Sequence, residues 1–117
     1  MPVPRTLSLW LPVVAWAALI FAFSSIPSLS SGLGTWDLVL RKVAHAAEFA
    51  VLGGLLVRAL DRELPAFLLG VAYAVSDELH QSFVEGRHGA PRDVAIDAAG
   101  VLIGILLVRQ LRLRGRA

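Results

Sequence analysis

The chain has 117 residues, of which 56% are hydrophobic and 17% are charged, and its mean hydropathy is +0.69. A soluble domain is usually about 45–50% apolar and about 25% charged, so this composition argues against a soluble globular protein. The sequence has no cysteine, which excludes disulfides, CxxC redox motifs and thiolate catalysis. The formal net charge is only +2, and the arginines form no stripe with interleaved aromatic residues, which argues against nucleic acid as a partner.

Four apolar segments of transmembrane length follow one another along the chain. A spanning helix needs about 20 mostly apolar residues. The sequence therefore predicts an all-α, polytopic membrane protein, a compact bundle of four transmembrane helices forming one domain over residues 1–117. The predicted helices cover approximately residues 7–25, 38–60, 64–84 and 93–111. We expect the first to be a retained anchor, because its apolar run exceeds the about 7–15 residues of a signal-peptide core.

Three polar connections separate these helices. Residues 26–35 are rich in proline, serine and glycine, residues 61–63 are Asp-Arg-Glu, and residues 85–92 contain glycines and a proline, all typical of loops. With four crossings, both termini and the connection at 61–63 lie on one side of the membrane. That side carries seven of the eleven Lys and Arg residues. The positive-inside rule then predicts a multi-pass protein of the cell membrane with cytoplasmic termini.

Nearly all polar residues within the predicted helices fall at the ends that meet on the outer side. They are Ser24, Ser25, Lys42, His45, Glu48, Asp77, Glu78, His80, Gln81, Asp93 and Asp97. Lys42, His45 and Glu48 recur every third residue, which places them on one arc of about 120°. Asp77 and Gln81 stack at i, i+4. Because charges inside a membrane cost several kcal/mol unless paired or hydrated, we expect the ionisable side chains of the second and third helices to share one pocket near the outer interface. They are His45, Glu48, Asp77, Glu78 and His80, and Arg87 is expected to reach back from its loop to at least one of their carboxylates.

The fourth predicted helix carries acids and glycines on a single stripe. Asp93, Asp97, Gly100 and Gly104 recur at helical spacing. Gly100-x-x-x-Gly104 is the small-residue pattern that lets two membrane helices pack closely. The face that packs is therefore expected to turn the acids inward, and the same kind of packing allows a homo-oligomer.

The polar residues also carry a resemblance to a known family. The matching stretches are Trp16 with Ser24-Ser25-x-Pro27; Lys42-x-x-His45-x-x-Glu48-Phe49-x-x-Leu52-Gly53; and Asp77-Glu78-x-His80-Gln81-x-Phe83-x-x-Gly86-Arg87, continuing to Asp93, Asp97 and Gly100. In order and spacing the chain resembles the VanZ-like family of small integral membrane proteins, named for a teicoplanin resistance determinant. Asp97 departs from the family pattern, which favours Asn. The resemblance implies work in the cell envelope and, in some members, lowered susceptibility to glycopeptide antibiotics.

The first functional hypothesis is a membrane-embedded enzyme that acts on lipid head groups or lipid-linked envelope precursors. The predicted catalytic residues are His45, Glu48, Asp77, Glu78 and His80. The predicted substrate-binding residues are Lys42, Gln81, Arg87, Arg92, Asp93, Asp97, Ser24 and Ser25. His45 or His80 would be the nucleophile or general base, because imidazole titrates near neutral pH. Arginine and lysine side chains would hold phosphate oxygens.

Two other classes of function stay open. One is a non-catalytic protein that binds a lipid or antibiotic or scaffolds an envelope complex, and the other is a small transporter or proton relay. The cofactor is also open. His45, Glu48, Asp77 and His80 offer ligands suited to Zn²⁺ or Mn²⁺, but the sequence has no HExxH motif, so no metal ligand is assigned. The expected partners are membrane lipids or a lipid-linked precursor.

Overall fold

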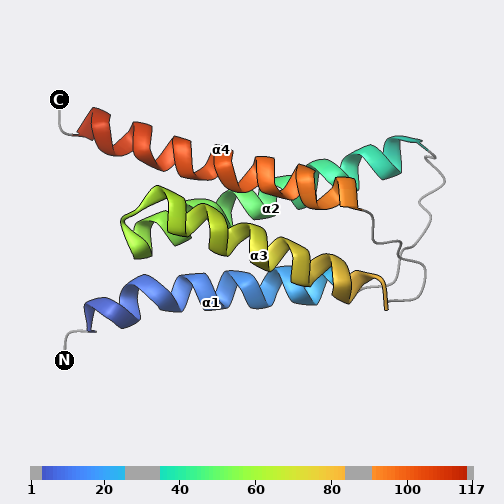
Figure 1. Cartoon of the computed structure of the whole chain (residues 1–117), viewed down its shortest axis with the longest axis horizontal. Coiled ribbons are helices and arrows are strands. Elements are labelled where there is room, and N and C mark those ends of the chain that lie inside the picture. Colours follow the sequence, from blue (N-terminus) through green and yellow to red (C-terminus); the bar gives the residue numbers. More distant parts are fainter. Residues whose placement is uncertain (1–3, 26–34, 84–90, 116–117) are drawn as a thin grey trace.

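The computed structural model describes residues 4–25, 35–83 and 91–115, which form four helices. They are α1 (Arg5–Ser24), α2 (Thr35–Leu60), α3 (Glu63–Gln81) and α4 (Pro91–Gly115). The predicted all-α, four-helix architecture is confirmed. The start of α1 and the end of α4 lie at one end of the bundle, and the end of α1, the start of α2, the end of α3 and the start of α4 lie at the other (Figure 1).

The ends of α4 differ from the sequence prediction. The helix begins at Pro91, whereas residues 85–92 were expected to form a loop, and it runs to Gly115, past the expected end at 111. Proline suits the first position of a helix, where its missing N–H leaves no bond unmade. Arginine is a good helix former and its charge is favourable in the last turn. Arg112 also donates a hydrogen bond from Nη1 to Asp61 Oδ1 at 2.8 Å, which helps to hold the extended end.

Three of the described helices are long and apolar enough to cross a membrane, namely Arg5–Ser24, Val39–Leu60 and Arg92–Gly115. Their outward surfaces are apolar, with Leu11 57% and Val43 61% exposed. Soluble monomers rarely expose large apolar patches, so the chain is a multi-pass membrane protein. α3 does not meet this standard, because its apolar stretch is confined to residues 64–76 between charged ends. That α3 also spans the membrane stays a prediction.

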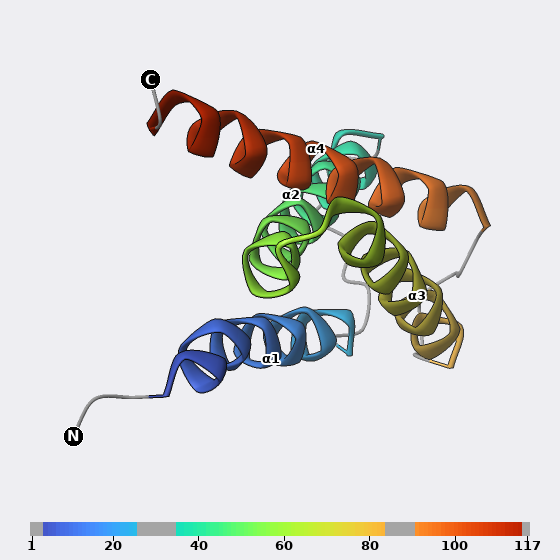
Figure 2. The ribbon, with the colours of Figure 1, turned by 60° about the vertical axis from the view of Figure 1, so that its left-hand side comes forward.

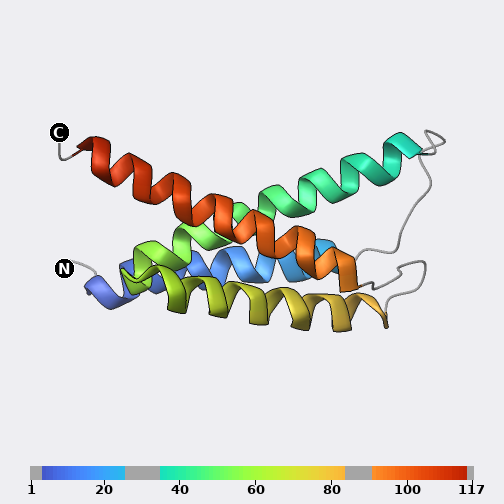
Figure 3. The same cartoon turned by 45° about the horizontal axis from the view of Figure 1, so that its top comes forward.

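Glycines bring α2 and α4 into backbone contact where the two helices cross (Figure 3). A Cβ atom on Gly100 would overlap the carbonyl oxygen of Ala46, and one on Gly104 would overlap that of Ala50. The predicted packing role of these two glycines is confirmed. Gly53 on α2 does the same from the opposite side, where a Cβ would overlap the backbone of α4. Such close approach provides van der Waals contact in a lipid environment that offers no hydrophobic driving force between helices.

α1 lies against α2 and α3, away from α4 (Figure 2). Two long-range hydrogen bonds hold the middle of this helix in place. The Trp16 indole Nε1 donates to the backbone oxygen of Glu48 at 2.8 Å, and the Tyr73 hydroxyl donates to the backbone oxygen of Ala17. The buried core of the bundle includes Ile20, Phe49, Leu52, Leu56, Val101 and Ile105. These contacts place the end of α1 beside the polar ends of α2 and α3.

Candidate functional site

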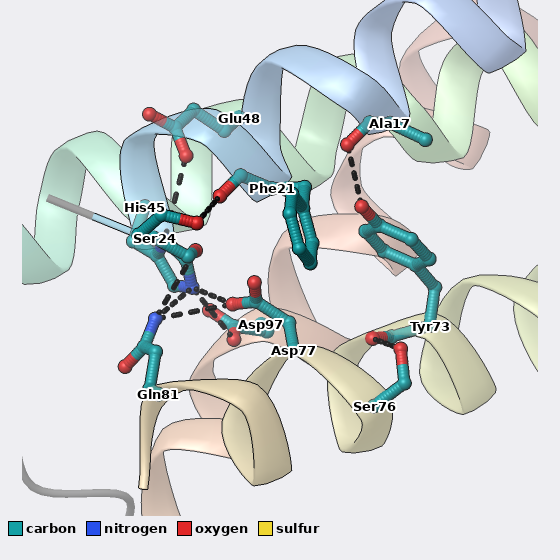
Figure 4. A network of polar contacts seen from close by, with 11 residues as sticks. Ala17, Phe21, Ser24, His45, Glu48, Tyr73, Ser76, Asp77, Gln81 and Asp97 are labelled. Carbon is teal, nitrogen blue, oxygen red and sulfur yellow. Dashed lines mark hydrogen bonds and ion pairs between the residues drawn. The ribbon is translucent and has the colours of Figure 1, made fainter. Parts of the chain in front are cut away.

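A partly buried histidine lies between two buried carboxylates at the polar end of the bundle. His45 comes from α2, Asp77 from α3 and Asp97 from α4. His45 Nε2 is 3.0 Å from Asp77 Oδ2 and 3.3 Å from Asp97 Oδ2. Both aspartates are only 3% exposed. Figure 4 shows the three side chains converging, and we call this group the central triad.

Glu48, Gln81 and Ser24 surround the central triad. Glu48 Oε2 lies 3.4 Å from His45 Nδ1, the ring nitrogen that faces away from the aspartates. The Gln81 amide donates from Nε2 to Asp77 Oδ2 at 3.1 Å and lies 3.4 Å from Ser24 Oγ. The structure therefore joins residues of all four helices into one polar network (Figure 4).

Three carboxylate oxygens near this network are buried without a hydrogen-bond partner among the described residues. They are Glu48 Oε2, Asp77 Oδ1 and Glu78 Oε2. Glu48 Oε2 is within ion-pair distance of His45, yet the contact lacks hydrogen-bond geometry. A buried polar atom left unsatisfied costs about 1–3 kcal/mol. Oxygens of this kind in a native structure call for an explanation, and a ligand, a proton or a bound ion supplies one.

The second histidine forms a separate pair at the end of α1. His80 Nε2 lies 2.8 Å from Ser25 Oγ, and the His80 ring stacks on Phe21 at a centroid distance of 4.2 Å. The Ser25 hydroxyl has one proton to donate and two acceptors within reach. They are His80 Nε2 and the backbone oxygen of Phe21, which is also 2.8 Å away. When this proton points to Nε2, the hydroxyl and imidazole have the arrangement of a nucleophile and its base.

A third polar contact lies at the more exposed edge of the polar end, which we call the rim. Lys42 Nζ is 3.1 Å from Asp93 Oδ1, and both side chains are partly exposed. Glu78 lies close to the start of α4, where the backbone N–H of Val94 bonds it. Arg92 is exposed on the first turn of α4. Arg87, predicted to reach back to a carboxylate, lies outside the described residues.

The structure thus sorts the predicted residues into groups. It brings Ser24, His45, Glu48, Asp77, Gln81 and Asp97 into one network, with Ser25–His80 and Lys42–Asp93 as separate pairs. The group with metal-ligand spacing is His45, Asp77 and Asp97, whose ligand atoms all lie within 4.8 Å of one another. This differs from the sequence-based set, in which Glu48 and His80 stood in place of Asp97. Those two side chains instead face His45 Nδ1 and Ser25.

Sequence reasoning missed two aromatic residues that support the network. Phe49 is fully buried and packs edge-on against the His45 ring at 5.1 Å. Tyr73 packs beside Phe49 and bonds to α1. One signal pointed to Tyr73, the only tyrosine in the chain, because it precedes Asp77 by four residues and so shares its helix face.

A protein-family model described as VanZ/LLP1 matches residues 6–113, from the first turn of α1 to the last turns of α4. No curated protein and no solved structure matches the chain significantly.

Proposed function

The chain belongs to the VanZ/LLP1 family of membrane proteins, and from the geometry of its polar end we propose that it is a membrane-embedded enzyme acting on phosphoester head groups of lipids or lipid-linked envelope precursors. The observation that carries the proposal is the Ser25–His80 pair, whose hydroxyl and imidazole lie 2.8 Å apart at the same end of the bundle as the central triad. Ionisable groups inside a membrane are costly, so a gathering of them indicates function.

The proposed topology has four crossings, with α3 included and its polar ends at head-group depth. The last turns of α2 and α4 carry Arg58, Arg112 and Arg114, and both turns lie at the end of the bundle where α1 starts, which the positive-inside rule assigns to the cytoplasm. The polar network then opens on the outer face of the cell membrane. Lipid head groups and lipid-linked precursors are the substrates within reach at this depth.

The two histidines have different roles in this proposal. His45 has carboxylates at both ring nitrogens, so neither nitrogen is free to attack a substrate. His80 has a hydroxyl at Nε2 and is only partly buried, so it is the better general base. His45 holds the aspartates in place and shapes the charge of the site.

The reaction that suits these groups is transfer or hydrolysis of a phosphoester. His80 takes the proton from a water molecule or from the Ser25 hydroxyl as that oxygen bonds to phosphorus. The bond between phosphorus and the oxygen of the leaving group breaks, and His80 gives the proton to this leaving oxygen. If Ser25 is the nucleophile, water releases the phosphoryl group in a second step.

Cationic side chains at the rim would bind the phosphate oxygens. Lys42 is held by Asp93 and is partly exposed, so a phosphate can approach it from the interface. Arg92 is exposed one residue before Asp93. For Arg87, the same phosphate-binding role rests on the family resemblance alone. Charge-assisted hydrogen bonds to phosphate are about twice as strong as neutral ones, which favours a phosphorylated head group over a neutral sugar.

Turnover of defined lipids tests this function. Purified protein in detergent is incubated with phosphatidyl lipids, lysophospholipids and polyprenyl phosphates, and released head groups or phosphate are quantified by mass spectrometry. We expect one class to be turned over, and His80→Gln and Ser25→Ala to lose at least 100-fold in rate. Ser82→Ala is the matched control, because the Ser82 hydroxyl only bonds its own helix backbone.

The outcomes separate the enzyme from the binding or scaffolding alternative. Turnover that depends on His80 supports the enzyme. A lipid that binds tightly and stays intact with every class tested, in wild type and His80→Gln alike, would reject it and favour a binding protein.

A further inference from the structure

We propose that the central triad is a binding site for one divalent transition-metal ion, with His45 Nε2, Asp77 and Asp97 as its protein ligands. The use of this metal on a phosphoester rests on the proposed function, whereas metal binding itself does not. The argument uses the spacing of the ligand atoms, the charge of the site and the groups that surround it.

The spacing matches a metal coordination shell. Zinc binds histidine nitrogen and carboxylate oxygen at about 2.0–2.2 Å, so neighbouring ligand atoms in a tetrahedral shell lie about 3.3–3.5 Å apart. His45 Nε2 lies 3.0 Å from Asp77 Oδ2 and 3.3 Å from Asp97 Oδ2. All three ligand atoms fall within 4.8 Å of one another. A small adjustment of side chains would therefore complete three vertices of the shell.

The charge of the site favours a divalent cation. Two buried aspartates bring two negative charges to a region lined by apolar side chains such as Phe49. A protonated His45 would neutralise only one of them, and Lys42 is paired with Asp93 instead. A metal ion with charge +2, the two aspartates and a neutral imidazole have no net charge together, and Glu48 beside His45 Nδ1 is a third carboxylate that adds to the need for positive charge. Binding replaces the proton on His45 Nε2, which is released to water.

The surrounding groups resemble the outer shell of a metal site. A histidine that binds a metal usually donates its other ring N–H to a carboxylate or carbonyl. Glu48 Oε2 lies 3.4 Å from His45 Nδ1 and is otherwise unsatisfied. A ligating carboxylate is usually hydrogen-bonded in turn, and Gln81 donates to Asp77 Oδ2 at 3.1 Å. Glu48 and Gln81 are thus positioning residues, which fix the ring and the carboxylate that bind the ion.

One buried oxygen of the central triad has no partner among the described residues and so also points to a ligand. Asp77 Oδ1 belongs to a side chain that is nearly fully buried, and no described group bonds it. A metal held by Asp77 would satisfy this carboxylate through one or both oxygens. With three protein ligands, a tetrahedral ion keeps one position open. That position suits water or a phosphate oxygen of the head group, whose charge the ion would stabilise.

Metal binding can be measured without any activity. Untagged protein, stripped with a chelator, is dialysed against Zn²⁺ and Mn²⁺, and bound metal is counted by elemental mass spectrometry. We expect one ion per chain. His45→Gln, Asp77→Asn and Asp97→Asn should each weaken binding at least tenfold, and Glu48→Gln by about 10–100-fold, the range for outer-shell partners. His80→Gln and Glu63→Gln are matched controls at other sites and should bind as wild type does.

A second measurement covers variants that fail to fold. X-ray absorption on wild-type protein loaded with Zn²⁺ should show one imidazole among oxygen ligands. No bound metal in wild type, equal binding in His45→Gln and His80→Gln, or a spectrum without imidazole would overturn the site. Lipid turnover by metal-free protein would overturn the catalytic use of the metal and leave the enzyme standing. A bound metal without any lipid turnover would leave the metal site standing and reject the proposed enzymatic function.

Discussion

Replacing Gly100 by alanine should both loosen the bundle and separate the central triad. A Cβ at this position would overlap the carbonyl oxygen of Ala46 and lie 3.2 Å from its carbonyl carbon. A backbone group cannot rotate away, so α2 and α4 must move apart. Overpacking costs about 1–3 kcal/mol, and a rigid neighbour favours the upper end. Alanine gains about 1 kcal/mol in helix propensity, which leaves a net loss of about 2 kcal/mol.

The same displacement acts on the site, because Ala46 follows His45 and Gly100 lies one turn after Asp97. The 3.3 Å contact between His45 and Asp97 would lengthen. A misplacement of about 1 Å costs on the order of 100-fold in rate, so turnover should fall by about that factor. Metal affinity should fall as well.

Unfolding in a denaturing detergent, followed by tryptophan fluorescence, measures the stability, and lipid turnover measures the effect on the site. Gly54→Ala is the matched control in the same helix interface. A Cβ there meets a methyl group of Val108 at 3.0 Å, which can shift, and the carbonyl oxygen of Gly104 at 3.6 Å, an ordinary van der Waals distance. We expect Gly54→Ala to stay within about 1 kcal/mol of wild type, the size of the propensity gain. If Gly100→Ala is as stable and as active as Gly54→Ala, the close α2–α4 contact does not set the geometry of the site.

Three further predictions concern topology, packing and physiology. Phe83→Cys, at a position 88% exposed at the polar end, should react with an impermeant maleimide on intact cells, whereas Asp61→Cys should react only after lysis. Trp16→Phe removes the donor to Glu48 O and should lower the free energy of unfolding by about 1 kcal/mol. Cells that express the wild-type protein should tolerate more teicoplanin than cells that express His80→Gln, as dilution assays of growth would show.

Each of these has a contradicting result. Labelling of Asp61→Cys alone on intact cells would place the polar network in the cytoplasm. An unchanged unfolding curve for Trp16→Phe would mean that the indole bond adds nothing to the docking of α1. Equal teicoplanin tolerance in both strains, at equal protein levels, would separate the site from antibiotic resistance.

The helices could be predicted from the sequence because a lipid bilayer restricts which backbone structures can span it. Long apolar stretches must satisfy their backbone hydrogen bonds internally, so they form helices. Helix ends were less predictable, as α4 shows. Pro91 and Arg112 were assigned to polar flanks, yet both lie within the helix, because proline fits a first turn and arginine fits a last turn. Hydropathy records the apolar span and not the hydrogen-bonded ends.

The polar network was predictable in outline and not in its pairings. Spacing placed Lys42, His45 and Glu48 on one helix face, and the zigzag of four helices placed that face near the polar end of α3. The angle at which α2 crosses α4 decides which acid meets which base. Asp97 therefore reaches His45 and Asp93 reaches Lys42, a result that periodicity along a single helix does not contain.

Arrangement in space also distinguished the two histidines. From the sequence, His45 and His80 were equal candidates for the general base. The fold gives His45 carboxylates at both ring nitrogens and gives His80 the Ser25 hydroxyl. Glu48 shares the helix of His45, but Asp77, Asp97 and Ser25 reach the two rings from other helices, so the difference depends mainly on the tertiary structure.

Phosphorus NMR of reconstituted protein tests the central claim most directly. The protein is placed in vesicles that contain the lipid class it turns over in detergent, and spectra are recorded over time for wild type and His80→Gln. We predict that the substrate resonance declines and a product resonance grows for wild type, at least 100-fold faster than for His80→Gln. Spectra that stay constant for wild type, with the lipid bound and unchanged, would contradict an enzymatic function.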